Sequence, residues 1–377
     1  MAVRAPVRFR QPAPPGCAFP SRIFTLALPG FRLNHYILRQ MKVLFDHTSP
    51  FLLAHGGVQT QIEQTRAALE AIGLEVEFLR WWDDRQRGDL IHFFGVASNP
   101  YLEQARALKL PVVMSSFLSE TCNRPDARLA RQGWLTRRIL ALPFGEGVKQ
   151  QLTWRAYRNC THNVVGIEAE RRALQIVHRV PAGRISVVPL GLSEAYLRAG
   201  RGARNESHLI CAGTIRPVKH CLELAEMARA AQVPVLFVGK PYSTGDPYWL
   251  YFKTLIDDRW VKYHPHAGSE AEMIGLLSAA RGYVHMSDYE NWSLSAHEAA
   301  ACGLPLLLQD QKWSRERFGD QARYFERIGT SEKNIEQLRR FHADAPNLPA
   351  PAVKLHGWNE VAGQLRTIYE RILSASR

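Results

Sequence analysis

Residues 283–308, YVHMSDYENWSLSAHEAAACGLPLLL, contain a complete strand–loop–helix–strand pattern. We expect a buried strand, a polar loop, a helix and a second buried strand, at residues 283–286, 287–293, 294–302 and 305–308. Gly303 follows the last helical residue and Pro305 comes soon after it, which is typical of a helix C-terminus. Short buried strands that alternate with helices predict a parallel α/β sheet.

Two carboxylates border the loop-to-helix step in this stretch, Glu290 in the loop and Glu298 on the helix. Open α/β sheets bind their ligands at the carboxyl ends of strands, beside helix N-termini, so both acids are candidate ligand-binding residues. Two structural alternatives remain open at this level. Ser295 and Glu298 have the spacing of a capping box, and Glu290 fits an ordinary solvated loop acid.

Length and composition indicate a soluble globular protein of two domains. The chain has 377 residues, of which 46% are hydrophobic and 22% charged. Its formal net charge of +13 favours anionic partners: a phosphorylated ligand, an acidic membrane face or nucleic acid. No helix-turn-helix, zinc-finger or RNP-type pattern is present, so we do not expect a nucleic-acid partner.

The six cysteines show neither CxxC pairing nor His/Cys ligand spacing. We therefore expect reduced thiols, no metal site and a cytoplasmic location, with peripheral contact at the inner face of the membrane as a further option. No apolar run approaches the roughly 20 residues that a membrane-spanning helix needs.

Residues 1–40 contain six arginines, six prolines and no acidic residue. We expect a basic, Pro-rich, disordered extension, because no hydrophobic period is sustained there. A targeting peptide is an alternative, and Met41 is a candidate for the true start of the chain.

From Met41 onward, two α/β alternations predict two doubly wound, Rossmann-like domains facing a central cleft. The first covers residues 41–197 and the second residues 208–350, and the Gly- and Arg-rich stretch 198–207 is expected to link them. Residues 351–377 contain a helix from about Trp358 to Leu373, which we expect to cross back to the first domain.

Residues 124–160 combine many arginines with large apolar residues such as Trp134 and Leu135. A basic amphipathic helix of this kind can lie in a membrane interface. The alternative is a helix that packs on its own domain and turns its arginines to water.

The order of motifs from Met41 to about Phe325 resembles the retaining glycosyltransferases of family four, which have the GT-B fold. Residues 290–305 are similar to the family's Glu-x7-Glu motif with its trailing Glu-Ala-x-x-x-Gly-x-Pro. Four other segments resemble family landmarks in the same order: His55-Gly-Gly-Val, Val187-Val-Pro-Leu-Gly, Ala212-Gly-Thr-Ile-Arg-Pro-Val-Lys219 and Arg315-Glu-Arg-Phe-Gly-Asp-Gln-Ala-Arg-Tyr-Phe.

This resemblance implies a role for each matching residue. Glu290 and the cations Arg216 and Lys219 are the candidate catalytic residues, because a diphosphate leaving group needs fixed positive charge. A solvated loop is the structural alternative for the two cations. The candidate donor-binding residues are Gly213, Asn291, Trp292, Ser293, Leu294 and Glu298, of which Glu298 is expected to bind the ribose hydroxyls. Gly56 and Gly57 would let the backbone approach phosphate or acceptor.

Three departures from the family pattern concern sugar positioning. A His is common after the strand 112–114, where this chain has Ser115-Ser116-Phe117. His92 is a nearby candidate substitute, with a packed strand residue as the alternative. Thr214 stands where many relatives have Arg. Asn291-Trp292-Ser293 stands where Gly-Phe-Gly is common, so that Trp292 is expected to narrow the sugar pocket.

The expected activity is a metal-independent, hexosyltransferase-type reaction of polysaccharide biosynthesis, with retention at the anomeric carbon. The partners are a nucleotide-sugar donor, which is a co-substrate rather than a cofactor, and a glycan or lipid-linked acceptor bound by the first domain. The alternative is a catalytically inactive nucleotide-sugar-binding subunit of another transferase. A GT-B epimerase is a third option, but the further acids that such an enzyme needs are not recognisable in this sequence.

Overall fold

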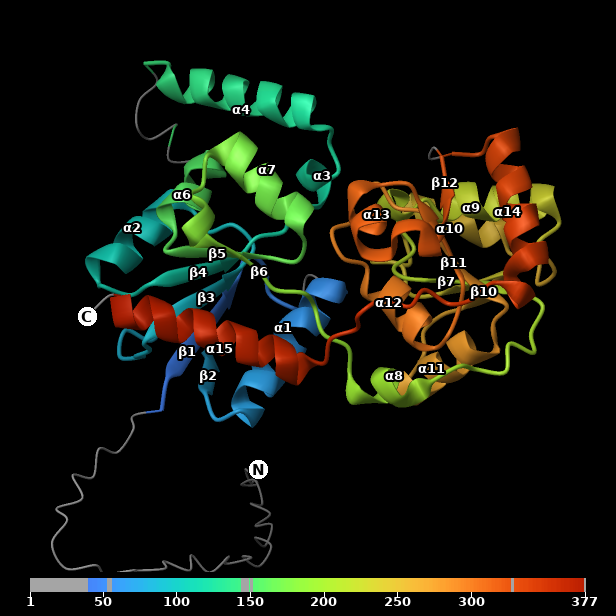
Figure 1. The fold of residues 1–377 in the computed structure, drawn as a ribbon, viewed down its shortest axis with the longest axis horizontal. Coiled ribbons are helices and arrows are strands. Elements are labelled where there is room, and N and C mark those ends of the chain that lie inside the picture. Colours follow the sequence, from blue (N-terminus) through green and yellow to red (C-terminus); the bar gives the residue numbers. More distant parts are fainter. Residues whose placement is uncertain (1–39, 53–55, 144–148, 150–151, 327–328, 376–377) are drawn as a thin grey trace, which may run out of the picture. The chain divides into compact units, whose positions relative to one another are not determined.

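The computed structural model describes residues 40–52, 56–143, 149, 152–326 and 329–375 (Figure 1). The extension expected at residues 1–40 lies outside this described part apart from Gln40, as do His55 of the glycine-loop motif and part of the basic segment 124–160. No helix in the described part is long and apolar enough to span a membrane.

The first sheet has six parallel strands in the order β2-β1-β3-β4-β5-β6. They are β1 Lys42–His47, β2 Glu75–Phe78, β3 Leu90–Phe94, β4 Val112–Ser115, β5 His162–Val165 and β6 Ile185–Val187. All residues of β3, β4 and β5 are buried, as expected for strands covered on both faces.

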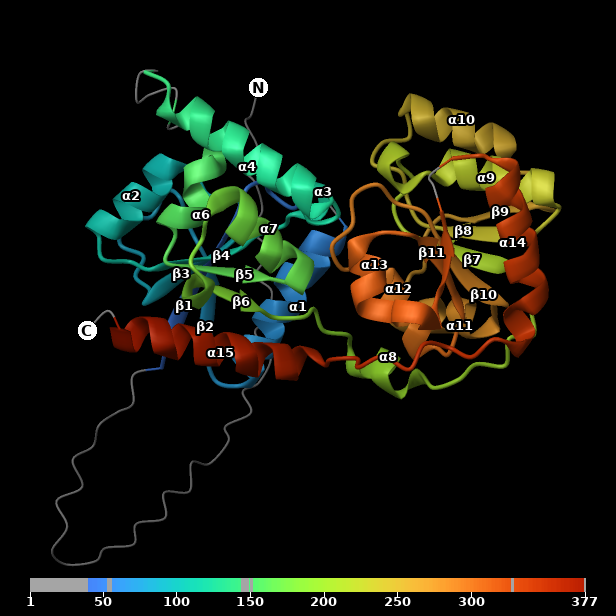
Figure 2. The same cartoon turned by 45° about the horizontal axis from the view of Figure 1, so that its top comes forward.

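Helices cover both faces of this sheet (Figures 1 and 2). In this half of the chain they are α1 Gly57–Ala71, α2 Asn99–Ala107, α3 Ser119–Cys122, α4 Asp126–Ala141, α6 Ala156–Asn159 and α7 Glu168–His178, with 3₁₀ turns at Thr153–Arg155 and Ala182–Arg184. The next helix, α8 Glu194–Ala199, packs instead in a cluster with the second sheet. Helix α1 shares one hydrophobic cluster with the C-terminal helix α15, Trp358–Ala375, whereas α2, α4, α6 and α7 share the cluster on the opposite face. The last helix of the chain therefore packs on the first sheet.

The second sheet also has six parallel strands, in the order β12-β11-β10-β7-β8-β9. They are β7 Leu209–Ala212, β8 Val235–Val238, β9 Val261–His264, β10 Gly282–His285, β11 Leu306–Gln309 and β12 Arg323–Phe325. Strand β10 lies between β7 and β11, so the motif stretch 283–308 forms the centre of this sheet.

The helices of the second half are α9 Cys221–Ala231, α10 Pro247–Leu255, α11 Glu270–Ala279, α12 Leu294–Ala301, α13 Lys312–Phe318 and α14 Glu332–Asp344, with 3₁₀ turns η3 Pro217–Lys219, η4 Gly319–Gln321 and η5 Ala345–Asn347. One buried cluster holds α11, α12 and α13 against the sheet, and a second holds α9, α10 and α14 against its other face (Figure 2). The α/β architecture expected from the sequence is thereby confirmed for both halves.

The expected helix at 294–302 is observed as α12, but its cap differs from the expected capping box. Ser293 is the N-cap residue, and its hydroxyl oxygen accepts a hydrogen bond from the Ala296 N–H at 3.4 Å. The Ser295 hydroxyl is hydrogen-bonded to the Tyr283 hydroxyl at 2.7 Å instead. The capping-box interpretation of Ser295 and Glu298 is therefore wrong, and Glu298 lies beyond the first turn.

Candidate active site

Two loops at the carboxyl ends of β7 and β10 are joined by backbone contacts. The Asp288 N–H and the Ser287 hydroxyl both donate to the Val218 carbonyl oxygen, at 3.0 and 3.1 Å. Val218 belongs to η3, the turn that ends in Lys219. These bonds bring the basic segment predicted from the sequence against the acidic loop.

Lys219 and Glu290 form an ion pair in which Lys219 Nζ lies 2.6 Å from Glu290 Oε1. Both side chains are largely buried, with 21% and 15% exposure. The ring of His285, at the end of β10, places Nε2 3.7 Å from the same oxygen. Burial by itself would raise the pKa of Glu290, but the charge of Lys219 and the nearby His285 hold it at about 2. Glu290 is therefore ionised at neutral pH.

His220, the residue after Lys219, contacts two further acids. Its Nδ1 lies 2.7 Å from Glu223 Oε1 on α9, and its Nε2 lies 2.8 Å from Asp288 Oδ2 in the motif loop. His220 is not among the site residues predicted from the sequence. The sequence shows that His220 follows Lys219. It does not show that two acids from other elements contact the His220 ring.

Arg216 and Lys219, expected to act together, have different partners in the structure. Arg216 Nη1 donates to the Tyr242 hydroxyl at 3.1 Å, and its guanidinium carbon lies 5.0 Å from the centre of the Tyr242 ring. Arg216 thus borders the loop after β8, while Lys219 contacts the motif loop.

The glycine at the end of β7 lies in close contact with a second glycine. Gly213 has φ +154°, and a Cβ added to Gly239 would lie 1.9 Å from the Gly213 carbonyl oxygen. No side chain therefore fits at Gly239, and glycine lets the backbones at the ends of β7 and β8 approach each other closely.

Gly56 brings the first half of the chain to the same place. It has φ +130°, and a Cβ built on it would lie 4.0 Å from Thr214 Oγ1, the residue after Gly213. A Cβ on Gly57 would meet no atom within 4 Å, so space does not require glycine at that position. Of the two predicted glycines, the structure places Gly56 against the end of β7.

Glu298 is half-buried on α12, and its nearest charged influence is the carboxylate of Glu270 at the start of α11. Burial and then repulsion from Glu270 raise the pKa of Glu298 to about 7. A carboxyl group held without a cation is suited to accept hydrogen bonds from neutral hydroxyl groups.

Trp292 is buried in the second core rather than open to solvent, with 3% exposure. Its ring stacks on His297, with centroids 4.5 Å apart and planes at 4°, and the Arg317 guanidinium carbon lies 4.2 Å from its centre. Its Nε1 has no hydrogen-bond partner among the described residues. Leu294, at the first position of α12, packs against the hydrophobic clusters of both halves.

Asn291 joins the motif loop to a buried glutamate of the first half. Its Nδ2 donates to Glu170 Oε1 at 2.9 Å, and Glu170 also accepts from the backbone N–H groups of Leu118 and Gly166, at 2.9 and 2.8 Å. Burial raises the pKa of Glu170, and these three donors oppose the shift. Asn123 adds a second bond across the halves, from its Nδ2 to the Glu290 carbonyl oxygen at 2.8 Å.

His92 has no free ring nitrogen. Nδ1 lies 2.6 Å from the Tyr369 hydroxyl of α15, and Nε2 lies 2.7 Å from Ser115 Oγ. The ring is fully buried and stacked on Phe94, and burial lowers its pKa to about 3. His92 is a neutral core residue, in agreement with the structural alternative weighed from the sequence.

Helix α4 packs on α7 and turns a basic and apolar face outward. Gly133 allows the close approach, since a Cβ there would lie 2.8 Å from the Ile176 carbonyl oxygen. Three arginines and three large apolar residues lie on the exposed side: Arg128, Arg131, Arg138, Trp134, Leu135 and Leu142. Among the described residues, no group of three or more His, Cys, Asp or Glu side chains could hold a metal ion.

No protein-family model matches the sequence. A search of curated proteins finds no match either. Solved structures are similar over most of this chain. A sucrose-phosphate synthase from Thermosynechococcus elongatus has 15% identity and a TM-score of 0.61, with 89% of this chain and 100% of that chain covered.

Two other structures are similar to this chain over 89% of its length and 99% of theirs. A glycosyltransferase from Rickettsia africae has 11% identity and a TM-score of 0.59. HepE from Anabaena, solved in complex with UDP-glucose, has 14% identity and a TM-score of 0.58. At these identities the likeness concerns the fold, and the chain has the GT-B fold.

Proposed function

We propose that this protein is a retaining, metal-independent glycosyltransferase that moves a hexosyl group from a nucleotide-diphosphate sugar to a glycan or lipid-linked acceptor. The observation that carries the proposal is the buried Lys219–Glu290 pair at the end of β10, directly before the N-terminus of α12. A structural neighbour that binds UDP-glucose supports a nucleotide-sugar donor.

The leaving group is the first chemical demand of this reaction. The bond between the anomeric carbon and the diphosphate oxygen breaks, so negative charge grows on the diphosphate. We assign the stabilisation of this charge to Lys219, Arg216 and the N–H groups at the start of α12, which follow the neighbouring strands β7 and β10. A cationic side chain and a helix N-terminus supply this stabilisation without a divalent ion.

Glu298 and Glu290 have different tasks in the proposed complex. Glu298, which faces no cation, accepts hydrogen bonds from the ribose hydroxyls. Glu290, with the backbone of Asn291, Trp292 and Ser293, holds the donor sugar while Lys219 remains paired to it. The acceptor hydroxyl then bonds to the anomeric carbon on the face that the diphosphate leaves, and its proton passes to the departing phosphate oxygen.

Nucleotide release tests the proposal. Purified protein is incubated with UDP-, GDP- and ADP-sugars and acceptor extracts, with and without EDTA. We expect release from at least one donor that is unchanged by EDTA. Loss of release on chelation would exclude the metal-independent mechanism. Donor binding without turnover under any condition would replace the enzyme by the alternative, an inactive nucleotide-sugar-binding subunit.

The exposed face of α4 supports peripheral contact with an acidic membrane surface. The helix carries Arg128, Arg131 and Arg138 beside Trp134 and has no acid after Asp126. Vesicles with and without anionic lipid test this contact by flotation. We expect Arg131→Glu to reduce flotation on anionic vesicles, and Arg85→Glu, at an exposed arginine elsewhere, to leave it unchanged. Equal losses would rule out a specific role of α4.

A further inference from the structure

The loop after β2 exposes two consecutive tryptophans. Trp81 is 76% exposed and Trp82 is 85% exposed, which makes Trp82 the most exposed aromatic side chain among the described large hydrophobic residues. Exposed indoles in adjacent positions leave a large apolar area in contact with water. Such a surface is a candidate binding site when the backbone that carries it is fixed.

Ion pairs and hydrogen bonds fix this loop. Arg80 contacts Glu77 Oε2 at 2.8 Å and Asp83 Oδ2 at 2.9 Å. Gln86 accepts from the Arg80 N–H at 2.8 Å, and its Nε2 donates to Glu77 and to the Phe78 carbonyl oxygen. Lys42 of β1 holds Glu77 from the neighbouring strand at 2.5 Å. The side chains immediately before and after the tryptophans are thus anchored to the sheet.

Trp81 is also held through its polar edge. Its Nε1 donates to Asp46 Oδ1 at 3.3 Å, and the Tyr101 hydroxyl donates to Asp46 Oδ2 at 2.8 Å. Asp46 lies near the end of β1, and Tyr101 lies in the first turn of α2, the helix that follows β3. The indole NH is used inside the protein, so the exposed remainder of the ring is apolar.

The tryptophans lie on the functional edge of the first sheet. All strands of that sheet are parallel, so the loops after β1 and β2 leave from the same edge. Gly56, the N-cap residue of α1, lies against Thr214. The Trp81–Trp82 surface therefore lies on the edge that borders the candidate active site.

We propose that Trp81 and Trp82 form a platform for neutral sugar units of the acceptor glycan, which rests on the proposed function. The C–H groups on one face of a pyranose are apolar and weakly positive, and they stack on the negative face of an indole. Asp84, two positions after Trp82, is exposed and offers carboxylate oxygens to sugar hydroxyls beside the platform.

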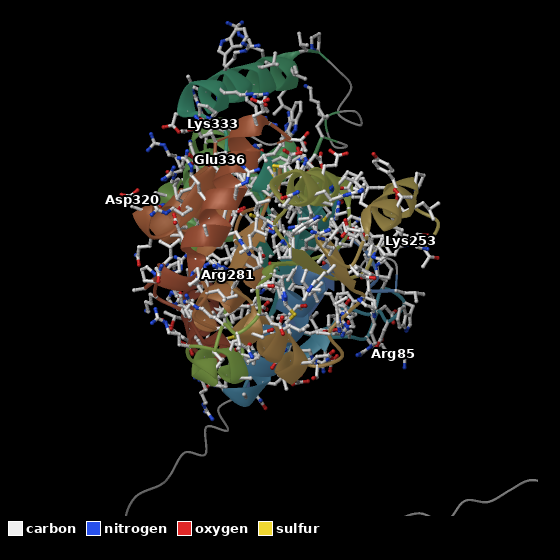
Figure 3. All side chains as sticks on the ribbon, turned by 90° about the vertical axis from the view of Figure 1, so that its right-hand side faces the viewer. Arg85, Lys253, Arg281, Asp320, Lys333 and Glu336 are labelled. Carbon is white, nitrogen blue, oxygen red and sulfur yellow. The ribbon has the colours of Figure 1, made fainter. Side chains whose placement is uncertain are left out.

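The charges near the platform disfavour an anionic membrane as its occupant. Asp83 and Asp84 directly follow Trp82, and Arg85 and Arg87 follow them, so the loop carries charges of both signs. Arg85 points outward from the ribbon at the margin of the view in Figure 3. The exposed face of α4, in contrast, carries three arginines and no acid after Asp126.

Binding to immobilised neutral glycans tests the platform in the full chain. An array of glucose, galactose, mannose and N-acetylglucosamine oligosaccharides identifies a bound glycan, and calorimetry then measures its affinity. We expect Trp82→Ala to weaken binding about tenfold, while Trp82→Tyr retains most of it, because stacking needs only an aromatic face. Trp134→Ala, at the exposed tryptophan of α4, is the matched control and should bind as the wild type.

Three outcomes overturn the platform: no glycan on the array binds, Trp82→Ala binds as tightly as wild type, or Trp134→Ala loses binding equally. Weaker flotation of Trp82→Ala on anionic vesicles, without a change in glycan affinity, would assign the surface to a membrane. Nucleotide-sugar binding is measured in parallel and should be unchanged in Trp82→Ala. Absence of donor binding in the wild type would contradict the proposed function, whatever the glycan result.

Discussion

Glu170 and Glu290 are two buried glutamates connected through adjacent positions of one loop, yet their pKa values shift in opposite directions. The pKa of Glu290 is lowered to about 2, although its burial alone would raise it. The pKa of Glu170 is raised, even though three N–H groups donate to its carboxyl group. The difference is the counter-charge: Glu290 has Lys219 at 2.6 Å, and Glu170 has only neutral donors as hydrogen-bond partners.

This comparison separates two ways of building one site. The half of the site in the second domain pairs its carboxylate with an opposite charge. This carboxylate therefore stays ionised and can bind a polar ligand. The half in the first domain uses a carboxyl group to join the chain segments around Leu118, Gly166 and Asn291. The first arrangement is suited to chemistry and the second to positioning.

Removal of the counter-charge should have the largest effect. We expect Lys219→Ala to lower kcat by about 10²–10³-fold, because a fixed charge that stabilises the leaving group is lost. The unpaired Glu290 carboxylate should also cost about 3–5 kcal/mol of unfolding free energy. Steady-state kinetics and urea unfolding measure the two effects.

A double variant separates the two effects of Lys219. Lys219→Met combined with Glu290→Gln removes both charges, so it should recover most of the stability and none of the activity. Recovery of activity in the double variant would contradict a direct role for Lys219 and leave it a structural ion pair.

Glu298 is a half-buried acid whose pKa, like that of Glu170, is raised by burial, and it extends the comparison to pH. Its folded-state pKa of about 7 lies above the ordinary glutamate value, so the folded state keeps this proton to higher pH than the unfolded state. The free-energy cost of ionising Glu298 in the folded state is therefore absent at pH 4, grows as pH rises and is complete above about pH 7.

Glu298→Gln should consequently stabilise the protein by up to about 3 kcal/mol above pH 7 and leave its stability unchanged at pH 4. The same change should weaken nucleotide binding by about 1–3 kcal/mol, because an amide is a poorer acceptor for ribose hydroxyls. Thermal unfolding across pH and calorimetry with UDP test both signs. If Glu298→Gln is less stable than the wild type at pH 8, the ionised Glu298 side chain stabilises the folded state and the prediction is wrong.

Glu170 should respond differently from the charged pair. We expect Glu170→Gln to destabilise by about 1–2 kcal/mol, because one amide end would face an N–H group of Leu118 or Gly166. Its effect on kinetics should be a higher KM for donor with little change in kcat, as the motif loop loses a support. Asn291→Ala, which removes only one of the three bonds, is the control and should lose less stability. Equal losses of stability in the two variants would show that Glu170 acts only through its contact with the motif loop.

The parts of the site that sequence could predict are those encoded within about one strand–helix unit. The motif stretch folds as expected because Gly303 and Pro305 end α12 and the apolar runs form β10 and β11. The Lys219–Glu290 contact follows from neighbouring strand ends in a parallel sheet. It was foreseeable once both loops were recognised, whereas the separate position of Arg216 over Tyr242 was not.

Other parts depend on contacts that local patterns do not encode. Glu170 and Asn291 are 121 positions apart, and α7 carries no motif that marks Glu170. Ser293 and Ser295 both suit an N-cap, and the choice between them depends on Tyr283, whose hydroxyl binds Ser295. The buried position of Trp292 likewise depends on His297 and on Arg317 from α13.

Arg317 gives the smallest expected effect, on the shape of the motif loop. Its guanidinium lies over Trp292, and its Nε donates to His297 Nε2 at 3.3 Å. Arg317 therefore contacts both rings of the Trp292–His297 stack and supports the motif loop. Arg317→Lys keeps the charge but loses the planar group, and we expect a loss of about 0.5–1 kcal/mol in unfolding free energy.

Arg315→Lys is the matched control for that loop effect. Arg315 lies on the same helix and stacks on Tyr324 at 3.7 Å, but it pairs with Asp310 and does not contact the motif loop. Both variants should lose a similar amount of stability in urea. Only Arg317→Lys should raise the donor KM, because only Arg317 supports Trp292 next to Glu290 and Ser293. A KM that rises equally in both variants would trace the change to α13 as a whole and remove Arg317 from the positioning of the donor loop.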